Sequence, residues 1–185
     1  MLVSLKWLRE YLDLPTELDI PELAELLTSA SAEVEGIEYR GSEWDSLIQV
    51  GYVTDVSPHP DADKLRLATV DYGADEPITV VCGAPNLDRG QRIAFAQAGA
   101  TVKNAQTGDN VKLKRAKIRG VESSGMVLSE AELGLAVSHD GILVLDKNAP
   151  IGMKLGEYLG DVILDVHVWP NRPDMMSMVG IAREL

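Results

Sequence analysis

Apolar side chains at helical spacing predict two amphipathic helices at the start of the chain. The first helix begins after Ser4, a favourable cap, and stops before Pro15, so that its leucines share one face. A second helix is predicted from about Pro21 to Ala30, with proline in the first turn, where its missing N–H costs nothing. The chain therefore opens with a short helical segment.

Beyond Gly41 the pattern changes to short β-rich runs, separated by clusters of glycine, proline, asparagine and aspartate. Ser129 and Glu132 have the spacing of a capping box, which predicts a brief helix ended by Gly134. The candidate strands are residues 47–56, 64–71, 78–82, 91–96, 111–119, 125–128 and 141–145.

From about Pro150 the chain returns to a mixed pattern. Residues 162–168 alternate between apolar and polar side chains, which predicts a strand. Asp174 has the residue type and position of an N-cap, and predicts a helix through Leu185.

The order of these elements predicts an α+β fold. A region of about 100 strand-rich residues lies between two helix-containing flanks, each too small to bury a core alone. We therefore expect residues 1–40 and 151–185 to form one discontinuous, small helical or mixed domain. Residues 41–150 form a small β-barrel inserted into it, and their strand spacing fits a Greek-key barrel of the OB-fold type.

The predicted strand over residues 111–119 has an internal conflict of register. Val111 and Leu113 alternate as inward residues, whereas Ala116 and Ile118 have the opposite parity. One extra residue, a β-bulge near residues 114–115, would reconcile the two halves. The bulge would also bring four cations onto one exposed side, namely Lys112, Lys114, Lys117 and Arg119.

Charge is distributed unevenly along the chain. The net charge is −12, yet residues 89–120 carry eight basic groups and one acidic group. Such a local excess of cations predicts an anion-binding face, and its interleaving with small and β-branched residues suits a nucleic-acid backbone. The alternative is a solvated strand face without a ligand. The candidate RNA contacts are Lys112, Lys114, Arg115, Lys117 and Arg119, with Ser123, Ser124 and Asn86.

Other polar residues have structural interpretations. The hydroxyl groups of Ser123 and Ser124 can bind phosphate or ribose, or can hold a tight turn before Gly125. Arg172, between two prolines, suits a buried ion pair or a subunit contact equally well. Structural roles are assigned to His59, Asp61 and Asp63 in a proline-rich turn, and to His139, His167 and the inert thiol Cys82.

Several function classes are excluded. No catalytic constellation, nucleotide-binding loop or metal-ligand spacing is present in the sequence. A single cysteine excludes an internal disulfide, and charged residues interrupt the apolar start of the chain, unlike a signal peptide. No apolar run approaches the ~18–20 residues that span a bilayer. We expect a soluble, cytoplasmic protein.

Motifs in the strand-rich region resemble the tRNA-binding OB domain of several synthetases and of free-standing tRNA-binding proteins. They are Pro58-His-Pro-Asp-Ala-Asp-Lys-Leu65, Thr69-Val-Asp-Tyr-Gly73, Val81-Cys-Gly-Ala-Pro-Asn86 and Lys117-Ile-Arg-Gly-Val-Glu-Ser-Ser-Gly-Met126. The remaining motifs resemble the start of the bacterial phenylalanyl-tRNA synthetase β subunit. They are Ser4-Leu-Lys-Trp-Leu-Arg-Glu-Tyr11, Ser129-Glu-Ala-Glu-Leu-Gly-Leu135, Pro170-Asn-Arg-Pro-Asp174 and Gly180-Ile-Ala-Arg-Glu184.

This resemblance implies an N-terminal part of a chain several times longer. It implies a noncatalytic role in binding or positioning tRNA, with tRNA-Phe as the expected partner, and in assembly with the α subunit as an α2β2 heterotetramer. ATP and Mg²⁺ are implied for the full phenylalanine–tRNA ligase, while this part alone is expected to be inactive and to hold no cofactor. Two alternatives remain: a free-standing tRNA-binding module, which has no use for the flanks, and a scaffold without RNA contact.

Overall fold

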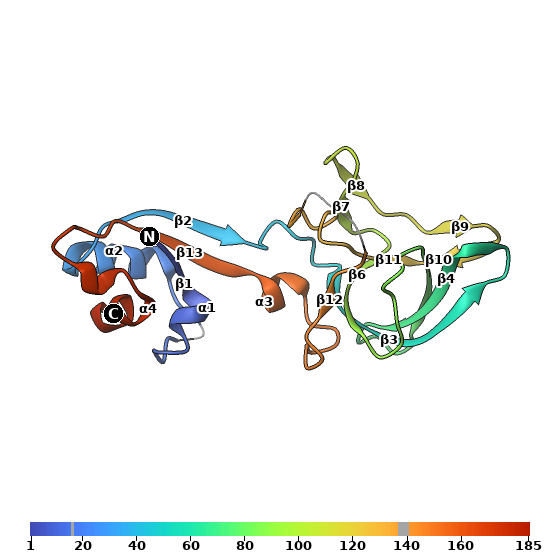
Figure 1. Cartoon of the computed structure of the whole chain (residues 1–185), viewed down its shortest axis with the longest axis horizontal. Helices are drawn as coiled ribbons and strands as arrows, with labels where there is room; N and C mark the ends of the chain where they lie inside the picture. Colours follow the sequence, from blue (N-terminus) through green and yellow to red (C-terminus); the bar gives the residue numbers. More distant parts are fainter. Residues whose placement is uncertain (16, 137–140) are drawn as a thin grey trace. The chain divides into compact units, whose positions relative to one another are not determined.

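The computed structural model describes every residue except 16 and 137–140. The chain divides into two compact units: residues 1–42 with 160–185, and residues 43–159 (Figure 1). The second unit is a small, nearly closed barrel, and the first combines three strands with short helices. The predicted α+β class with an OB-type barrel is confirmed.

The barrel unit extends further along the chain than the sequence pattern indicates. The sequence predicts residues 151–159 in the discontinuous domain, but α3 (Leu155–Leu159) packs against the barrel, where Leu155 is fully buried. Lys154 also forms a β-bridge with Gln49. A five-residue helix with one buried residue gives too little periodicity to be assigned to either side.

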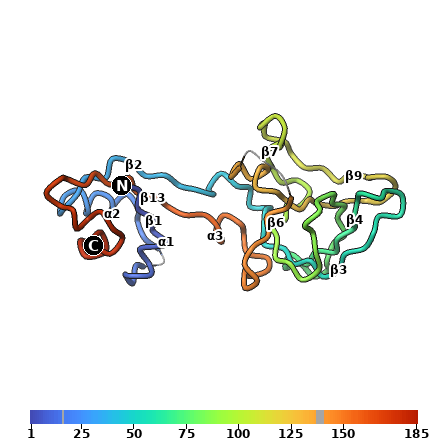
Figure 2. Tube along the Cα trace, in the orientation of Figure 1, coloured from blue at the N-terminus to red at the C-terminus, as the bar shows by residue number. Residues whose placement is uncertain are grey.

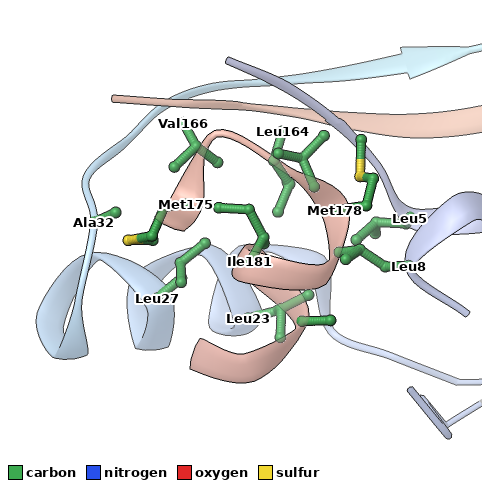
Figure 3. Close-up of a cluster of buried hydrophobic side chains, with 12 residues drawn as sticks. Leu5, Leu8, Leu23, Leu27, Ala32, Leu164, Val166, Met175, Met178 and Ile181 are labelled. Carbon is green, nitrogen blue, oxygen red and sulfur yellow. The ribbon is translucent and has the colours of Figure 1, made fainter. Parts of the chain in front are cut away.

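The first unit is an antiparallel sheet in the order β1-β13-β2. Residues from both flanks share its core, in which Leu8, Leu27, Leu164 and Ile181 are fully buried. Figure 3 shows this cluster between the helices and the sheet. The elements of the unit are β1 (Leu2–Ser4), α1 (Leu5–Leu8), α2 (Ile20–Ala30), β2 (Val34–Arg40), β13 (Asp161–Val166), the 3-10 helix η1 (Pro173–Met175) and α4 (Met178–Glu184).

Two helix boundaries in this unit differ from the prediction. Helix α1 ends at Leu8, well before Pro15. The last helix begins at Met178 and is capped by Ser177, whose hydroxyl accepts the Gly180 N–H at 3.1 Å, and not by Asp174. Aspartate and serine are both good caps, so the sequence alone did not decide between them.

Arg172 holds Asp174 and Glu184 in an ion-pair network. Its Nη2 lies 2.8 Å from Asp174 Oδ2 and 2.6 Å from Glu184 Oε1. The hydrogen bond from Arg172 lowers the pKa of Asp174. The pKa of Glu184 is also lowered. The larger cause is the hydrogen bond from Ser31, and the second is the hydrogen bond from Arg172. Of the two predicted alternatives for Arg172, the ion pair is present in the first unit, but it is half-buried and not buried, with the Arg172 side chain 31% exposed.

Replacing Arg172 by glutamine should change how the first unit responds to acid. Carboxylates with depressed folded pKa values stabilise the fold above their unfolded pKa, near 4, and lose this contribution as pH falls through the folded pKa. The variant should therefore have a lower urea midpoint than the parent at pH 6–7, and the difference should shrink below about pH 4. Arg9→Gln is the control, because it removes the same charge from a side chain of the first unit that donates to the Leu14 and Pro15 carbonyls. A difference that is constant with pH would contradict this linkage.

The barrel sheet has the order β11-β6-β3-β4-β5, with β12 paired to β6. Its two ends, β11 and β5, contact each other, so that the sheet almost closes around a core containing Ile48, Phe95 and Leu128. The strands are β3 (Ile48–His59), β4 (Ala62–Asp71), β5 (Ile78–Cys82), β6 (Arg92–Gln97), β11 (Gly125–Val127) and β12 (Val144–Leu145).

Two small hairpins extend the barrel between β6 and β11. The first pairs β7 (Thr101–Lys103) with β8 (Asn110–Lys112), and the second pairs β9 (Ala116–Ile118) with β10 (Val121–Ser123). Figure 2 shows β9 at the same end of the barrel as the turn between β3 and β4.

The capping box forms, but residues 130–134 form turns and not the predicted helix. The hydroxyl of Ser129 accepts the Glu132 N–H, and the Glu132 carboxylate accepts the Ser129 N–H. Gly134, with a φ of 74°, is the last residue of these turns. Among the described residues, no helix is long and apolar enough to cross a membrane.

Candidate nucleic-acid interface

The basic segment is not one bulged strand. It is divided into β8 and β9, which belong to different two-stranded sheets. Between them the backbone of Leu113 bonds to Gly99 and Ala100, and its side chain packs against the barrel core. Val111, a predicted inward residue, is 42% exposed. The register conflict between residues 111–113 and 116–118 is thus resolved because β8 ends and a separate strand, β9, begins. Leu113, anchored to the barrel, separates the two strands.

The β9–β10 hairpin turns through Arg119 and Gly120. Their φ values of 44° and 90° are both positive, as a two-residue type I′ turn requires. Ile118 and Val121 are the pair that flanks the turn. The hairpin presents Lys117 and Arg119 to solvent.

His59 clamps this hairpin to the turn between β3 and β4. Its imidazole is buried, and Nδ1 accepts the Asp61 N–H at 3.1 Å. Nε2 lies 3.2 Å from the Ile118 carbonyl and is therefore the nitrogen that carries the proton. Arg119 adds a bond from Nη1 to the Asp61 carbonyl, at 3.3 Å. The predicted turn role of His59 is thus a specific one: it joins two hairpin turns.

All five predicted cations of residues 112–119 are exposed. Within the described part of the chain none of them forms an ion pair with a carboxylate. Lys117 lies opposite Glu122 across the hairpin. Backbone hydrogen bonds, with a contribution from the charge of Lys112, lower the pKa of Asp45. Lys114 and Arg115, between the two hairpins, are therefore the least compensated charges.

A groove of about 550 Å³ lies beside these cations. The end of β5 and the loop after it (81–85) line one part of it. The rest of the lining comes from Leu113, Lys114, Ala116, Ile118, Ser123, Gly125, Met126, Val127, Ser129, Glu132 and Gly141. Arg66 holds the loop after β5 in place, because its Nη2 donates to the carbonyls of Ala84 and Pro85 at 2.6 and 2.8 Å. Cys82 lines the groove, and burial raises the pKa of its thiol.

The structure gives Ser123 and Asn86 intramolecular partners. Ser123 is buried, and its hydroxyl accepts the Val81 N–H at 3.1 Å and donates to the Gly125 carbonyl at 3.0 Å. The side-chain amide of Asn86 donates to the Ile142 carbonyl and accepts the Ile142 N–H. Ser123 thus holds the groove wall from within, and Asn86 ties its loop to Ile142, so neither side chain is among the proposed RNA contacts.

Ser124 is half-buried, and its carbonyl accepts the Ala98 N–H. His167 bonds to Glu35 and stacks edgewise on Trp169 in the first unit. His139 lies outside the described residues. Over the described ranges no group of three or more histidine, cysteine, aspartate or glutamate side chains could hold a metal ion.

Two residues acquire roles that the sequence did not suggest. His59 looked like an isolated turn residue, because its partner Ile118 is far away in sequence. The sequence indicates Glu132 only as part of a capping box, yet this residue lines the groove. In the sequence, only the spacing between Ser129 and Glu132 pointed to a role for Glu132, and that spacing predicts a local capping box and not a groove.

Comparison with known proteins places this barrel in a family. Residues 48–154 match the family model described as "Putative tRNA binding domain". The whole chain is 48% identical to the phenylalanine–tRNA ligase beta subunit of Dehalococcoides mccartyi and 44% identical to that of Geobacillus kaustophilus. It covers 22% and 23% of these two relatives, respectively. A MetRS-related protein from Pyrococcus horikoshii is 25% identical, with a TM-score of 0.41 over 58% of this chain and 87% of that chain.

The relatives match this chain over all its residues, flanks included. The resemblance drawn from the motifs to synthetase β subunits is therefore confirmed. Because the family model covers more than half of the residues and coincides with the barrel, the chain belongs to the tRNA-binding domain family.

Proposed function

We propose that this chain is the noncatalytic N-terminal part of a phenylalanine–tRNA ligase β subunit, and that its barrel binds and positions tRNA. The observation that carries the proposal is the set of exposed cations at residues 112–119 on a barrel of the tRNA-binding family, where none forms an ion pair with a carboxylate of the described residues. Cations scattered evenly over a chain of net charge −12 would support solubility equally well, so solubility does not explain why they cluster here.

The first unit would support assembly with an α subunit, as the β-subunit name of the relatives suggests. We propose that the assembly is an α2β2 heterotetramer and that tRNA-Phe is the tRNA to which it attaches phenylalanine. ATP and Mg²⁺ would act in parts of the enzyme other than this chain. The flanks favour this proposal over a free-standing RNA-binding module, because they form a second core that a lone barrel does not need.

The proposed contacts are with phosphates and not with base edges. Lys114, Arg115 and Lys117 project from short, exposed segments. Lysine is a flexible point charge without bidentate geometry, and the planar guanidinium of Arg115 matches the geometry of a phosphate. Phosphate contacts position a nucleic acid but carry no sequence information. Binding by these residues should therefore be weak, tolerant of sequence and steeply dependent on salt.

Substituting Lys114, Arg115 and Lys117 by alanine together should lower tRNA affinity by about tenfold or more at low salt. The slope of log affinity against log salt should fall by about one unit for each lost contact. Affinity is measured by fluorescence anisotropy with two different tRNAs, for the chain and for the assembled synthetase. Both tRNAs should lose affinity equally.

The matched control removes three exposed cations elsewhere on the barrel unit, Arg89, Lys147 and Lys154. This variant has the same net charge, so it separates a local contact from a general electrostatic effect. If the two triple variants behave alike, or if the first keeps the parent affinity and slope in the assembled enzyme, the barrel is a scaffold without RNA contact.

A further inference from the structure

The groove beside the basic segment is mostly apolar. Val81, Leu113, Ile118, Met126 and Val127 supply much of its lining, and Lys114 is the one basic residue among the described residues that line it. Its volume of about 550 Å³ lies within the range of small-molecule sites. Such a surface favours a flat, weakly solvated group over a phosphate, which would give up much of its hydration and gain mainly the ammonium group of Lys114.

Glu132 brings one directed acceptor to this apolar groove. Its Oε2 accepts two hydrogen bonds from Ser129, from the N–H at 2.6 Å and from the hydroxyl at 2.8 Å. These bonds fix the carboxylate in one orientation. Within the described residues, the second oxygen, Oε1, accepts no side-chain or backbone hydrogen bond. The groove therefore combines apolar walls, a basic residue and a fixed acceptor.

We propose that this groove receives one unstacked base of a single-stranded RNA segment, and that Glu132 selects a base with an exocyclic amine. Phosphates on either side of the base would lie on Lys114, Arg115 and Lys117. The inference rests on the proposed function and adds to it a base-reading residue. A carboxylate accepts from the amino group of cytosine, and an adenine amine offers the same donor. Uracil places an acceptor at this position, facing the carboxylate.

Charge favours RNA as the occupant. An apolar peptide would make no use of the neighbouring cations, and an acidic peptide would bring carboxylates towards Glu132. RNA separates its charge from its apolar part, because the phosphates and bases lie on opposite sides of the ribose. This separation matches cations at the exposed segment and apolar side chains within the groove.

Glu132→Gln tests the base preference without removing the capping box. Glutamine is accepted at this position of the box, so its carbonyl can take the two bonds from Ser129. Its amide NH₂ then replaces Oε1 and offers a donor to the groove. We expect the parent chain to bind short homopolymers of C and A about fivefold more tightly than U. In the variant this preference should vanish or reverse, with U bound at least as well as before.

Glu130→Gln is the matched control, because Glu130 is exposed, lies two residues away and is absent from the groove lining. It makes the same change in charge and should leave the preference for C and A intact. Cys82, the only thiol, reports on occupancy: saturating oligo(C) should slow its alkylation in the parent chain.

The outcomes separate this inference from the proposed function. Equal affinity for all three homopolymers, equal behaviour of the two glutamine variants, or unprotected Cys82 would overturn base reading in the groove. The proposed function would still stand if the triple cation variant lost salt-dependent binding. Absence of any RNA binding, or tighter binding of an acidic peptide that protects Cys82, would overturn both.

Discussion

Replacing His59 by alanine should release the β9–β10 hairpin and weaken RNA binding about tenfold, although the imidazole is buried and only 5% exposed. The substitution leaves the Asp61 N–H and the Ile118 carbonyl without their partner, and an unsatisfied group of this kind costs about 1–3 kcal/mol. The hairpin can avoid that cost by moving into water. Lys117 and Arg119 would then lose their fixed position beside the groove.

Hydrogen exchange distinguishes this effect from general destabilisation. The amides of β9 and β10 should exchange faster in His59→Ala, while those of β4 and β6 keep the protection of the parent chain. The salt slope of tRNA binding should fall by about one to two units. His167→Ala, in the first unit, is the control and should change neither quantity.

Two conservative variants test the geometry of the clamp. His59→Gln can place an amide N–H near the position of Nε2 and keep the bond to Ile118, whereas His59→Asn keeps an acceptor near the position of Nδ1 for Asp61. We expect the glutamine variant to recover most of the hairpin protection and RNA affinity, and the asparagine variant to recover little. Equal recovery by both would show that filling the site matters more than joining the two turns.

Strands with a strong local pattern were predictable from sequence. Strands β4, β5 and β6 lie within two residues of their predicted bounds, because apolar runs between turn residues carry their own signal. Strand β2 was not predicted, because it has no alternating apolar pattern. Val34 and Ile37 are half-buried, and its other residues are exposed. Its pairing with β13, more than 100 residues away, forms the strand, and no local pattern reports that contact.

The candidate site was predictable only in part, for the same reason. The exposure of Lys114, Arg115 and Lys117 follows from their own chemistry, since unpaired cations avoid burial. The division of the basic segment depends on the hydrogen bond between Leu113 and Ala100. The position of the Ser123 side chain likewise depends on its hydrogen bond from the Val81 N–H. These partners come from different strands, so a parity argument along one segment proposed a bulge where the chain instead changes sheets.

Replacing Phe95 by alanine should lower the free energy of unfolding of the barrel unit by about 3–5 kcal/mol. The ring is fully buried on β6 and lies 5.3 Å from the ring of Tyr72, centroid to centroid. Added Cβ atoms at Gly51 and Gly125 would meet Phe95 at 2.9 and 2.6 Å. Two of its neighbours are thus glycines without side chains that could fill the cavity, so the loss should lie in the upper part of that range.

Urea unfolding followed through the Trp44 indole signal measures this loss, because Trp44 donates to the Leu133 carbonyl within the barrel unit. Phe95→Leu is the control that removes less volume, and should cost roughly half as much. Leu164→Ala, in the core of the first unit, should leave the barrel midpoint unchanged if the two cores unfold separately. A Phe95→Ala loss below about 1 kcal/mol would contradict the packing seen around the ring.

Gly125→Ala shows whether this ring explains the glycine of the Ser-Ser-Gly-Met motif. Its added Cβ would lie 2.6 Å from both the Ala96 carbonyl oxygen and the Phe95 ring, and overpacking of this kind costs about 1–3 kcal/mol. In the Phe95→Ala background one of the two clashes is absent. The double variant should therefore be more stable than the two separate losses predict, by about 1 kcal/mol. Strict additivity would assign the need for glycine to the Ala96 carbonyl alone, since removing the ring would then have relieved nothing.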